Sequence, residues 1–292
     1  MYGLRSPVAV TAHDAGAANF ILGWLRDCEN MDVRCCVDGP AQTLFSEYLV
    51  ERGSVPLANA LNGAQILLSG TSRVSTLEHD SRILARSLGV RSIGVIDHWV
   101  NYRERFIRQD QFVLPDELWV SDGYALLEAK KYFPDTPVIQ RPNRYLEQLT
   151  KEIGQVSIKH HERTRILYAL EPIRSKWGRN DISGEFQSLE YFISRIPTLI
   201  NGHGVEIRLR PHPSDALHKY DQWLAVNRNY DISIDTTLSL ASAIAWSDWV
   251  VGCETYAMVV ALNAGKRVFS SLPPDGPTCR LPFPGIIHLA TT

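Results

Sequence analysis

The feature that most constrains the fold is a regular alternation of short apolar strands with helical segments along the chain. Parallel neighbours in a sheet need a crossover connection between them, and that connection is usually a helix. The alternation therefore favours an α/β protein built on doubly wound parallel sheet. In the first half the expected strands are residues 8–12, 33–37, 65–69, 91–96, 118–120 and 137–139, and the clearest expected helices are 77–88 and 124–133.

The alternation breaks at residues 143–161, which are polar and helical and which we expect to connect two domains. It then restarts, with expected strands at 165–170, 205–210, 231–234, 249–251 and 266–269 and expected helices at 186–200, 217–226, 238–246 and 256–264. A chain of 292 residues suits two domains of ordinary size. We predict two Rossmann-like domains, residues 1–154 and 155–292, that face each other across a cleft.

The composition and charge of the chain bear on its binding partners and on its location in the cell. Hydrophobic residues make up 45% of the chain, enough for real cores, and a formal net charge of -2 gives no basic field for nucleic acid. The five cysteines are an odd number without metal-ligand spacing, which is typical of reduced thiols in a cytosolic protein. No basic-then-apolar leader and no apolar run of membrane-spanning length is visible, so we expect a cytoplasmic protein.

A motif at residues 208–215 follows one of the expected strands in the second half. The two prolines of this motif end the strand by Pro211, which places Arg210 and His212 at the carboxyl edge, where open α/β sheets bind ligands. Arginine offers a bidentate fork for phosphate and histidine a second donor. The alternative is a surface ion pair and a histidine in a rigid turn. Ser214 or Asp215 is expected to cap the following helix.

A second motif, residues 252–255, ends the strand at 249–251. Glycine turns the chain there, and the amides at the start of the next helix favour an anion. Thr255 either caps that helix or donates to a phosphate, and Glu254 either joins the site or complements the helix dipole. Together with the motif at 208–215, the pattern favours one shared phosphate site. The loop carrying Arg174 and Lys176 is a candidate cationic lid over the same ligand.

In the first half, polar side chains follow two expected strands. His13 and Asp14 open a loop of small residues before a helix, a natural cradle for an anion or a sugar, although the full dinucleotide glycine pattern is missing. Asp97 and His98 begin a segment that also carries aromatic residues and arginines, as sugar sites often do. The alternative for residues 99–106 is an amphipathic helix with its aromatic residues in the core and its arginines in water.

These motifs resemble the donor half of GT-B glycosyltransferases. The resemblance is greatest to bacterial sialyltransferases and Kdo transferases with an HP motif, which here is His212-Pro213. Where the sialyltransferases hold the nucleotide phosphate with a serine pair, this chain has Glu254-Thr255. Those families also carry an acidic base within a short acidic motif ending in glycine, and the only similar string here is Ser121-Asp122-Gly123. Teichoic-acid-type polymerases and UDP-sugar 2-epimerases share the fold.

The resemblance implies a metal-independent glycosyltransferase without a cofactor. It would move a sugar from a nucleotide-activated donor, with a CMP-sugar favoured, to a glycan or a lipid-linked acceptor in surface-polysaccharide synthesis. A lipid-linked acceptor would bring peripheral contact with a membrane. The alternatives are a UDP-sugar 2-epimerase-like enzyme and a non-catalytic nucleotide- or glycan-binding module. The residues predicted to bind the donor are Arg174, Arg210, His212, Pro213, Glu254 and Thr255.

The proton acceptor of the proposed chemistry is expected in the first domain. A base must take a proton from a sugar hydroxyl, and partial burial that raises the pKa of a carboxyl group would help it. Asp97 and Asp14 are ranked nearly level, with the histidines behind them, so that the predicted catalytic residues are Asp97, Asp14, His13 and His98. The alternative is that Asp97 caps a helix beginning at Trp99 and Asp14 caps a helix beginning near Gly16.

Overall fold

A computed structural model describes residues 2–28, 30–50, 53–157, 161–173, 176–200 and 204–291. The chain packs as two compact units, Met1–Tyr145 and Leu146–Thr292. Helix α7 (Arg144–Gln155) spans the division between them, and the predicted boundary after residue 154 lies inside the same helix. Arg174, one of the predicted donor-binding residues, lies outside the described residues.

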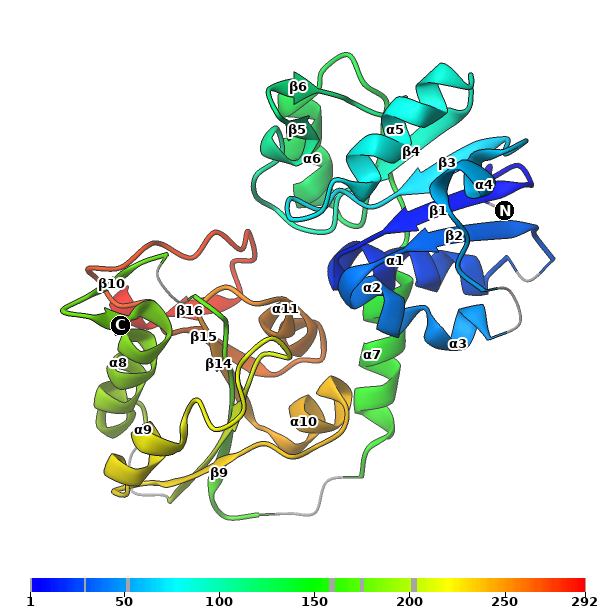
Figure 1. The fold of residues 1–292 in the computed structure, drawn as a ribbon. Helices are drawn as coiled ribbons and strands as arrows, with labels where there is room; N and C mark the ends of the chain where they lie inside the picture. The colour runs from blue at the N-terminus through cyan, green and yellow to red at the C-terminus, as the bar shows by residue number, and fades with distance from the viewer. Residues whose placement is uncertain are drawn as a thin grey trace. The chain divides into compact units, whose positions relative to one another are not determined.

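Unit 1 contains a six-stranded sheet in the order β2-β1-β3-β4-β7-β8, and all of its strand pairs are parallel. Its helices cover both faces, with α1 and α5 on opposite sides (Figure 1). The interior strand β1 is buried along its whole length, as expected for a strand covered by helices on two faces. The sheet strands are β1 (Val8–Ala12), β2 (Val33–Val37), β3 (Ile66–Ser69), β4 (Arg91–Val95), β7 (Glu117–Val120) and β8 (Val138–Gln140).

The helices of unit 1 are α1 (Ala15–Arg26), α2 (Gly39–Leu44), α3 (Ser46–Leu49), α4 (Leu57–Leu61), α5 (Leu77–Ser87) and α6 (Gly123–Tyr132). Between β4 and β7 the chain forms only one 3-10 turn, η1 (Glu104–Phe106), and a small hairpin of β5 (Ile107–Arg108) and β6 (Gln111–Phe112). The alternative of an amphipathic helix at 99–106 is therefore wrong. Trp99 and Phe106 are buried as it required, but Arg105 is buried as well, and only Arg103 is exposed.

Unit 2 contains a second six-stranded parallel sheet, in the order β13-β12-β9-β14-β15-β16. Helices α8 and α10 lie on opposite faces of it (Figure 1). Its strands are β9 (Thr164–Ala169), β12 (Val205–Arg210), β13 (Asp231–Ile234), β14 (Trp249–Gly252), β15 (Arg267–Ser270) and β16 (Ile286–His288), followed by η2 (Leu289–Thr291). Its helices are α8 (Gly184–Leu199), α9 (Asp221–Val226), α10 (Leu240–Trp246) and α11 (Tyr256–Asn263).

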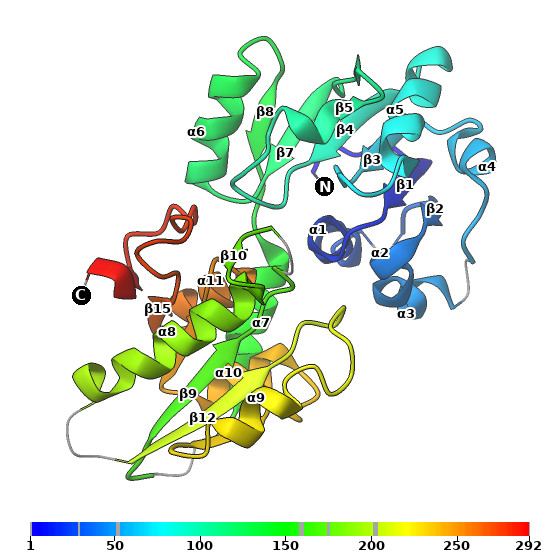
Figure 2. The same ribbon diagram turned by 60° about the vertical axis from the view of Figure 1, so that its left-hand side comes forward.

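A hairpin of β10 (Gly178–Arg179) and β11 (Ile182–Ser183) precedes α8 (Figure 2). The core of unit 2 is formed where the apolar sides of α8 and α9 pack on β9 and β12, with Phe192 against Tyr168 and Trp223 nearby. The helix expected to begin at residue 217 begins only at Asp221. Neither Ser214 nor Asp215 therefore caps it, and that expectation is wrong.

The prediction of two doubly wound, Rossmann-like parallel sheets is confirmed. In each sheet the direction of winding reverses beside the first strand, which creates a crevice at the carboxyl edge. In unit 1 the reversal lies between β1 and β3, and in unit 2 between β9 and β14. Within the described ranges, no helix is both long and apolar enough to span a bilayer.

Candidate functional site

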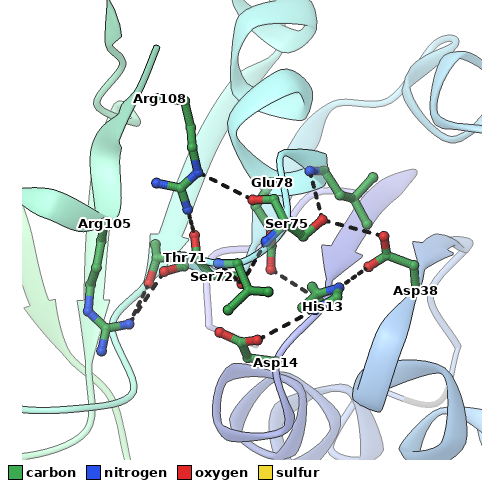
Figure 3. A network of polar contacts seen from close by, with 11 residues as sticks. His13, Asp14, Asp38, Thr71, Ser72, Ser75, Glu78, Arg105 and Arg108 are labelled. Carbon is green, nitrogen blue, oxygen red and sulfur yellow. Dashed lines mark hydrogen bonds and ion pairs between the residues drawn. The ribbon is translucent and has the colours of Figure 1, made fainter. Parts of the chain in front are cut away.

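The crevice of unit 1 gathers polar side chains from the ends of three strands and the start of α5 (Figure 3). His13 follows β1, and its Nδ1 lies 2.7 Å from Oδ1 of Asp38, which follows β2. The backbone N–H of His13 donates to Oε1 of Glu78 over 2.9 Å. His13 is thus held by a carboxylate on its ring and by another on its backbone.

Glu78 is the most deeply buried carboxyl group of this cluster, with 1% of its surface exposed. Among the described residues its Oε2 is one of the buried side-chain atoms that lack a hydrogen-bond partner. Burial raises the pKa of Glu78 to about 7, although the hydrogen bond from His13 and the charge of Arg82 act in the opposite direction. The sequence reasoning missed both Glu78 and Asp38.

Asp14 lies next to His13, with 3.9 Å between its Oδ1 and Nε2 of the imidazole, and its side chain is 39% exposed. Partial burial raises its pKa, a hydrogen bond with Ser72 lowers it, and the charge of Asp97 raises it again. Asp14 occupies the N-cap position of α1, but its side chain accepts no capping hydrogen bond. The capping alternative is therefore wrong for Asp14, whose carboxylate accepts no backbone N–H of α1.

Asp97 is held in a different way. Its Oδ1 accepts a hydrogen bond of 2.7 Å from Arg105, which also donates to Oγ1 of Thr71 over 3.2 Å. Gly16 packs so closely on this carboxylate that a Cβ atom at residue 16 would lie 1.9 Å from Oδ2 of Asp97. No helix begins at Trp99, so the capping alternative is wrong for Asp97 too. The carboxylate of Asp97 is thus ion-paired with Arg105 and packs against Gly16 of α1.

His98 and Asp122 have local structural partners. Nδ1 of His98 accepts the backbone N–H of Trp99 over 3.0 Å. Asp122 caps α6 by accepting from the N–H of Ala125 over 2.8 Å, and it also accepts from Nε1 of Trp99 over 2.8 Å. The similarity of 121–123 to an acidic base motif therefore coincides with a helix cap. The structure brings His13, Asp14 and Asp97 close together, since Nε2 of His13 lies 3.9 Å from Oδ1 of Asp14 and Asp97 packs on Gly16, two residues after Asp14.

In unit 2, Arg210 ends β12 with its guanidinium paired to Asp235, whose side chain is fully buried. The same NH1 group donates to the carbonyl oxygen and to Oγ1 of Thr237, each over 3.2 Å. An arginine that is bound this way has part of its donor fork occupied by the protein. Arg210 therefore forms an ion pair, as the alternative prediction for this residue had it, but its partner carboxylate is buried and not at the surface.

His212 and Pro213 are both exposed in the turn after β12. Nδ1 of His212 accepts the backbone N–H of Ser214 over 3.1 Å, so the proton of a neutral ring lies on Nε2. Asp215 accepts from the backbone N–H of His212, from Lys219 and from Tyr220, and these partners lower its pKa against the effect of burial. These hydrogen bonds hold the turn, and the imidazole of His212 lies on its surface.

The second motif is occupied by a carboxylate of the protein itself. Oε1 of Glu171, which follows β9, accepts the backbone N–H groups of Cys253 over 3.1 Å and of Glu254 over 2.7 Å. Burial, together with the charge of Glu254, raises the pKa of Glu171 to about 7 against these hydrogen bonds. Thr255 caps α11 by accepting from the N–H of Ala257, which is the simpler of its two predicted roles.

Glu171 and Glu254 line a pocket of about 500 Å³ in unit 2, together with Lys176, Trp177 and Arg280. Arg280 forms an ion pair with Glu254, with its Nε 3.0 Å from Oε2 of the carboxylate. The pocket lies at the reversal point of the second sheet and contains side chains of both charges and an indole ring. A volume of about 300–1,000 Å³ is usual for small-molecule sites.

Among the residues that the structure describes, no group of three His, Cys, Asp or Glu side chains is arranged to hold a metal ion. The expectation of metal-independent chemistry remains a prediction.

No protein-family model and no curated protein matches this chain. The solved structures that are similar to it include a putative UDP-N-acetylglucosamine 2-epimerase from Listeria monocytogenes, with a TM-score of 0.59 and 14% identity over 91% of this chain and 79% of that one. A UDP-N-acetylglucosamine 2-epimerase from Rickettsia bellii has a TM-score of 0.56 and 10% identity, covering 90% of this chain and 78% of that one. A glycotransferase of kitacinnamycin has a TM-score of 0.52 and 12% identity, covering 91% and 80%. The fold is GT-B-like, as predicted.

Proposed function

We propose that this chain is an enzyme acting on a nucleotide-activated sugar, whose glycosyl group it transfers to a hydroxyl group of a carbohydrate acceptor. The observation that supports the proposal is the burial, the raised pKa and the missing cap hydrogen bond of Asp14. It is a partly buried carboxyl group at the reversal point of unit 1, its pKa is raised, and no helix N–H uses it as a cap. Those are the properties that a general base for a sugar hydroxyl needs.

Asp14 accepts the proton of the acceptor hydroxyl while the oxygen of that hydroxyl bonds to the anomeric carbon of the donor sugar. The bond between that carbon and the phosphate oxygen breaks, and the nucleotide leaves with the electron pair. Hydrogen-bond donors of unit 2, His212 and Arg210 among them, would stabilise the negative charge on the departing phosphate.

The HP motif, His212-Pro213, is the reason to propose a CMP-activated sugar as the donor. Arg174, Glu254 and Thr255 remain proposed contributors to donor binding, and synthesis of a surface polysaccharide in the cytoplasm remains the proposed context. A lipid-linked acceptor would bring the enzyme to a membrane surface.

Epimerisation of a UDP-sugar is the second candidate, because two of the structurally similar proteins above are named UDP-N-acetylglucosamine 2-epimerases. An epimerase also needs a proton acceptor beside the sugar, so Asp14 serves either reaction. Incubating the chain with UDP-N-acetylglucosamine and no acceptor separates the two candidates, since only an epimerase yields a changed sugar nucleotide under those conditions.

The test of the leading proposal begins with calorimetry on CMP, UDP, GDP and CDP, followed by transfer assays with the activated sugars of whichever nucleotide binds. Asp14→Asn should leave nucleotide affinity unchanged and lower turnover by about 10²–10⁴-fold, the usual contribution of a general base. Asp80→Asn, at an exposed carboxylate on α5, is the matched control and should change neither quantity. The proposal fails if none of the nucleotides binds, or if Asp14→Asn turns over at the normal rate.

A further inference from the structure

The ends of β1 and β2 place His13 and Asp38 side by side. In the register of this parallel pair Ala12 lies opposite Val37, so the next residue of each strand enters the crevice at the same level. Neighbouring strands are about 4.8 Å apart, a separation that an imidazole and a short carboxylate can bridge. The observed Nδ1 to Oδ1 distance of 2.7 Å is that of a charge-assisted hydrogen bond.

The ring of His13 is also fixed by contacts that do not involve Asp38. Gly39 has a φ of +53°, and a Cβ atom there would lie 2.4 Å from Cε1 of the imidazole. A side chain at this position would be strained by the backbone conformation and would collide with the ring. The backbone N–H of His13 is bound to Glu78, as described above. With 18% of its side chain exposed, His13 has little room to take another orientation.

These contacts decide which ring nitrogen carries the proton. An ionised carboxylate only accepts hydrogen bonds, so Nδ1 of a neutral His13 must be the N–H that donates to Asp38. Nε2 is then left with its lone pair, and it lies 3.9 Å from Oδ1 of Asp14. A hydroxyl oxygen placed between two atoms at this separation is within hydrogen-bond reach of both.

We propose that Asp38 is a positioning residue that holds His13 with a bare Nε2, so that the crevice offers a second proton acceptor beside Asp14. This inference rests on the proposed function and adds to it. The proton of the acceptor hydroxyl goes to either group, and when it goes to Nε2 the carboxylate of Asp38 balances the imidazolium charge. Asp38 touches no reacting atom and takes no proton.

The tautomer of His13 is the direct test, and it needs no substrate. Imidazole ¹⁵N chemical shifts of the full chain should show the proton on Nδ1 at a pH where His13 is neutral. Asp38→Asn should move it to Nε2 in a measurable fraction of molecules, because the amide group of asparagine can donate to Nδ1. Asp80→Asn is the control and should leave the His13 signals in place. A proton on Nε2 in the unmodified chain, or no change in Asp38→Asn, would overturn the inference.

Gly39→Ala tests the packing against the ring. It should displace the His13 signals, whereas Gly63→Ala should not. Gly63 also has a positive φ, of +68°, but no atom lies within 4 Å of a Cβ placed there. Both variants therefore carry the backbone strain, and only one of them carries the collision. Equal effects of the two variants on His13 would contradict the close packing of residue 39 against the ring.

Turnover gives a readout that a merely structural role would not produce. The readout is the turnover that remains once Asp14 has been replaced. Asp14→Asn should retain residual turnover that a second change, Asp38→Asn, removes, because His13 is the remaining acceptor. If Asp38→Asn has no effect in the Asp14→Asn background, the inference is wrong even though the proposed function stands. If the chain binds no nucleotide, the proposed function is wrong and the tautomer measurement still decides the role of Asp38.

Discussion

Glu78 makes the stability of unit 1 depend on pH in a direction that can be worked out from the structure. Burial raises its pKa from an ordinary value of 4.5 to about 7. In the unfolded chain the carboxyl group ionises near the lower value, whereas in the folded chain it stays protonated until the higher one. Its contribution to stability is therefore fully present below about pH 4.5 and is lost as the pH rises through about 7.

The size of the effect follows from the shift. A displacement of this magnitude corresponds to about 3 kcal/mol of unfolding free energy, of which about 2–3 kcal/mol falls between pH 5 and pH 8. Because Glu78 is 1% exposed, screening by water does not reduce this figure much. The raised value already includes the opposing attraction of Arg82 and the hydrogen bond from His13.

Glu78→Gln removes the titration and keeps an acceptor oxygen for the N–H of His13. The unfolding free energy of this variant minus that of the unmodified chain should therefore be about 2–3 kcal/mol larger at pH 8 than at pH 5. Hydrogen exchange of the β1 amides measured in increasing urea reports unit 1, and the β9 amides of unit 2 serve as an internal reference. Glu47→Gln, at an exposed carboxylate of α3, is the control for loss of a charge. A difference between variant and unmodified chain that is equal at both pH values would refute the reasoning.

Two further predictions concern single side chains. Gly16→Ala places a Cβ atom on the carboxylate of Asp97 and should destabilise unit 1 by about 1–3 kcal/mol in urea unfolding. The control Gly123→Ala, with no atom within 4 Å of its Cβ, should not destabilise it. Equal effects of the two variants would contradict the close packing. His212→Ala should weaken nucleotide binding by about 1.5–3 kcal/mol in calorimetry. The control His218→Ala changes another exposed histidine farther along the turn and should leave the affinity unchanged. A folded His212→Ala variant with normal affinity would exclude His212 from the nucleotide site.

The strands could be predicted from the sequence because a parallel sheet covered on both faces uses continuous apolar runs. β1, β3 and β7 are buried at every residue, and runs of this kind stand out from the polar segments between them. The rule that ligands bind at the carboxyl edge then selected His13, Asp14 and Asp97. The same rule would have selected Asp38, since it follows the strand at 33–37 directly.

Other parts of the site could not be predicted, because they depend on contacts between distant segments. Glu78 lies in the first turn of a helix, where a carboxylate usually faces water and complements the dipole. Nothing local indicates that β1 and α5 bury it. Arg105 was expected to be either functional or in water, and it lies instead in an ion pair with Asp97. That pairing depends on the irregular path of residues 98–106, for which no helix or strand period exists.

The second motif in unit 2 also depends on a contact between distant segments, and this contact affects where a phosphate would bind. The sequence predicts free amides at 252–255, but the amides of Cys253 and Glu254 donate to Glu171, which follows the neighbouring strand β9. An anion that used these amides would have to displace that carboxylate or bind while it is protonated, and it would meet the charge of Glu254 beside it. A phosphate bound at the end of β14 therefore requires a change in Glu171, and the turn after β12 remains the other proposed position.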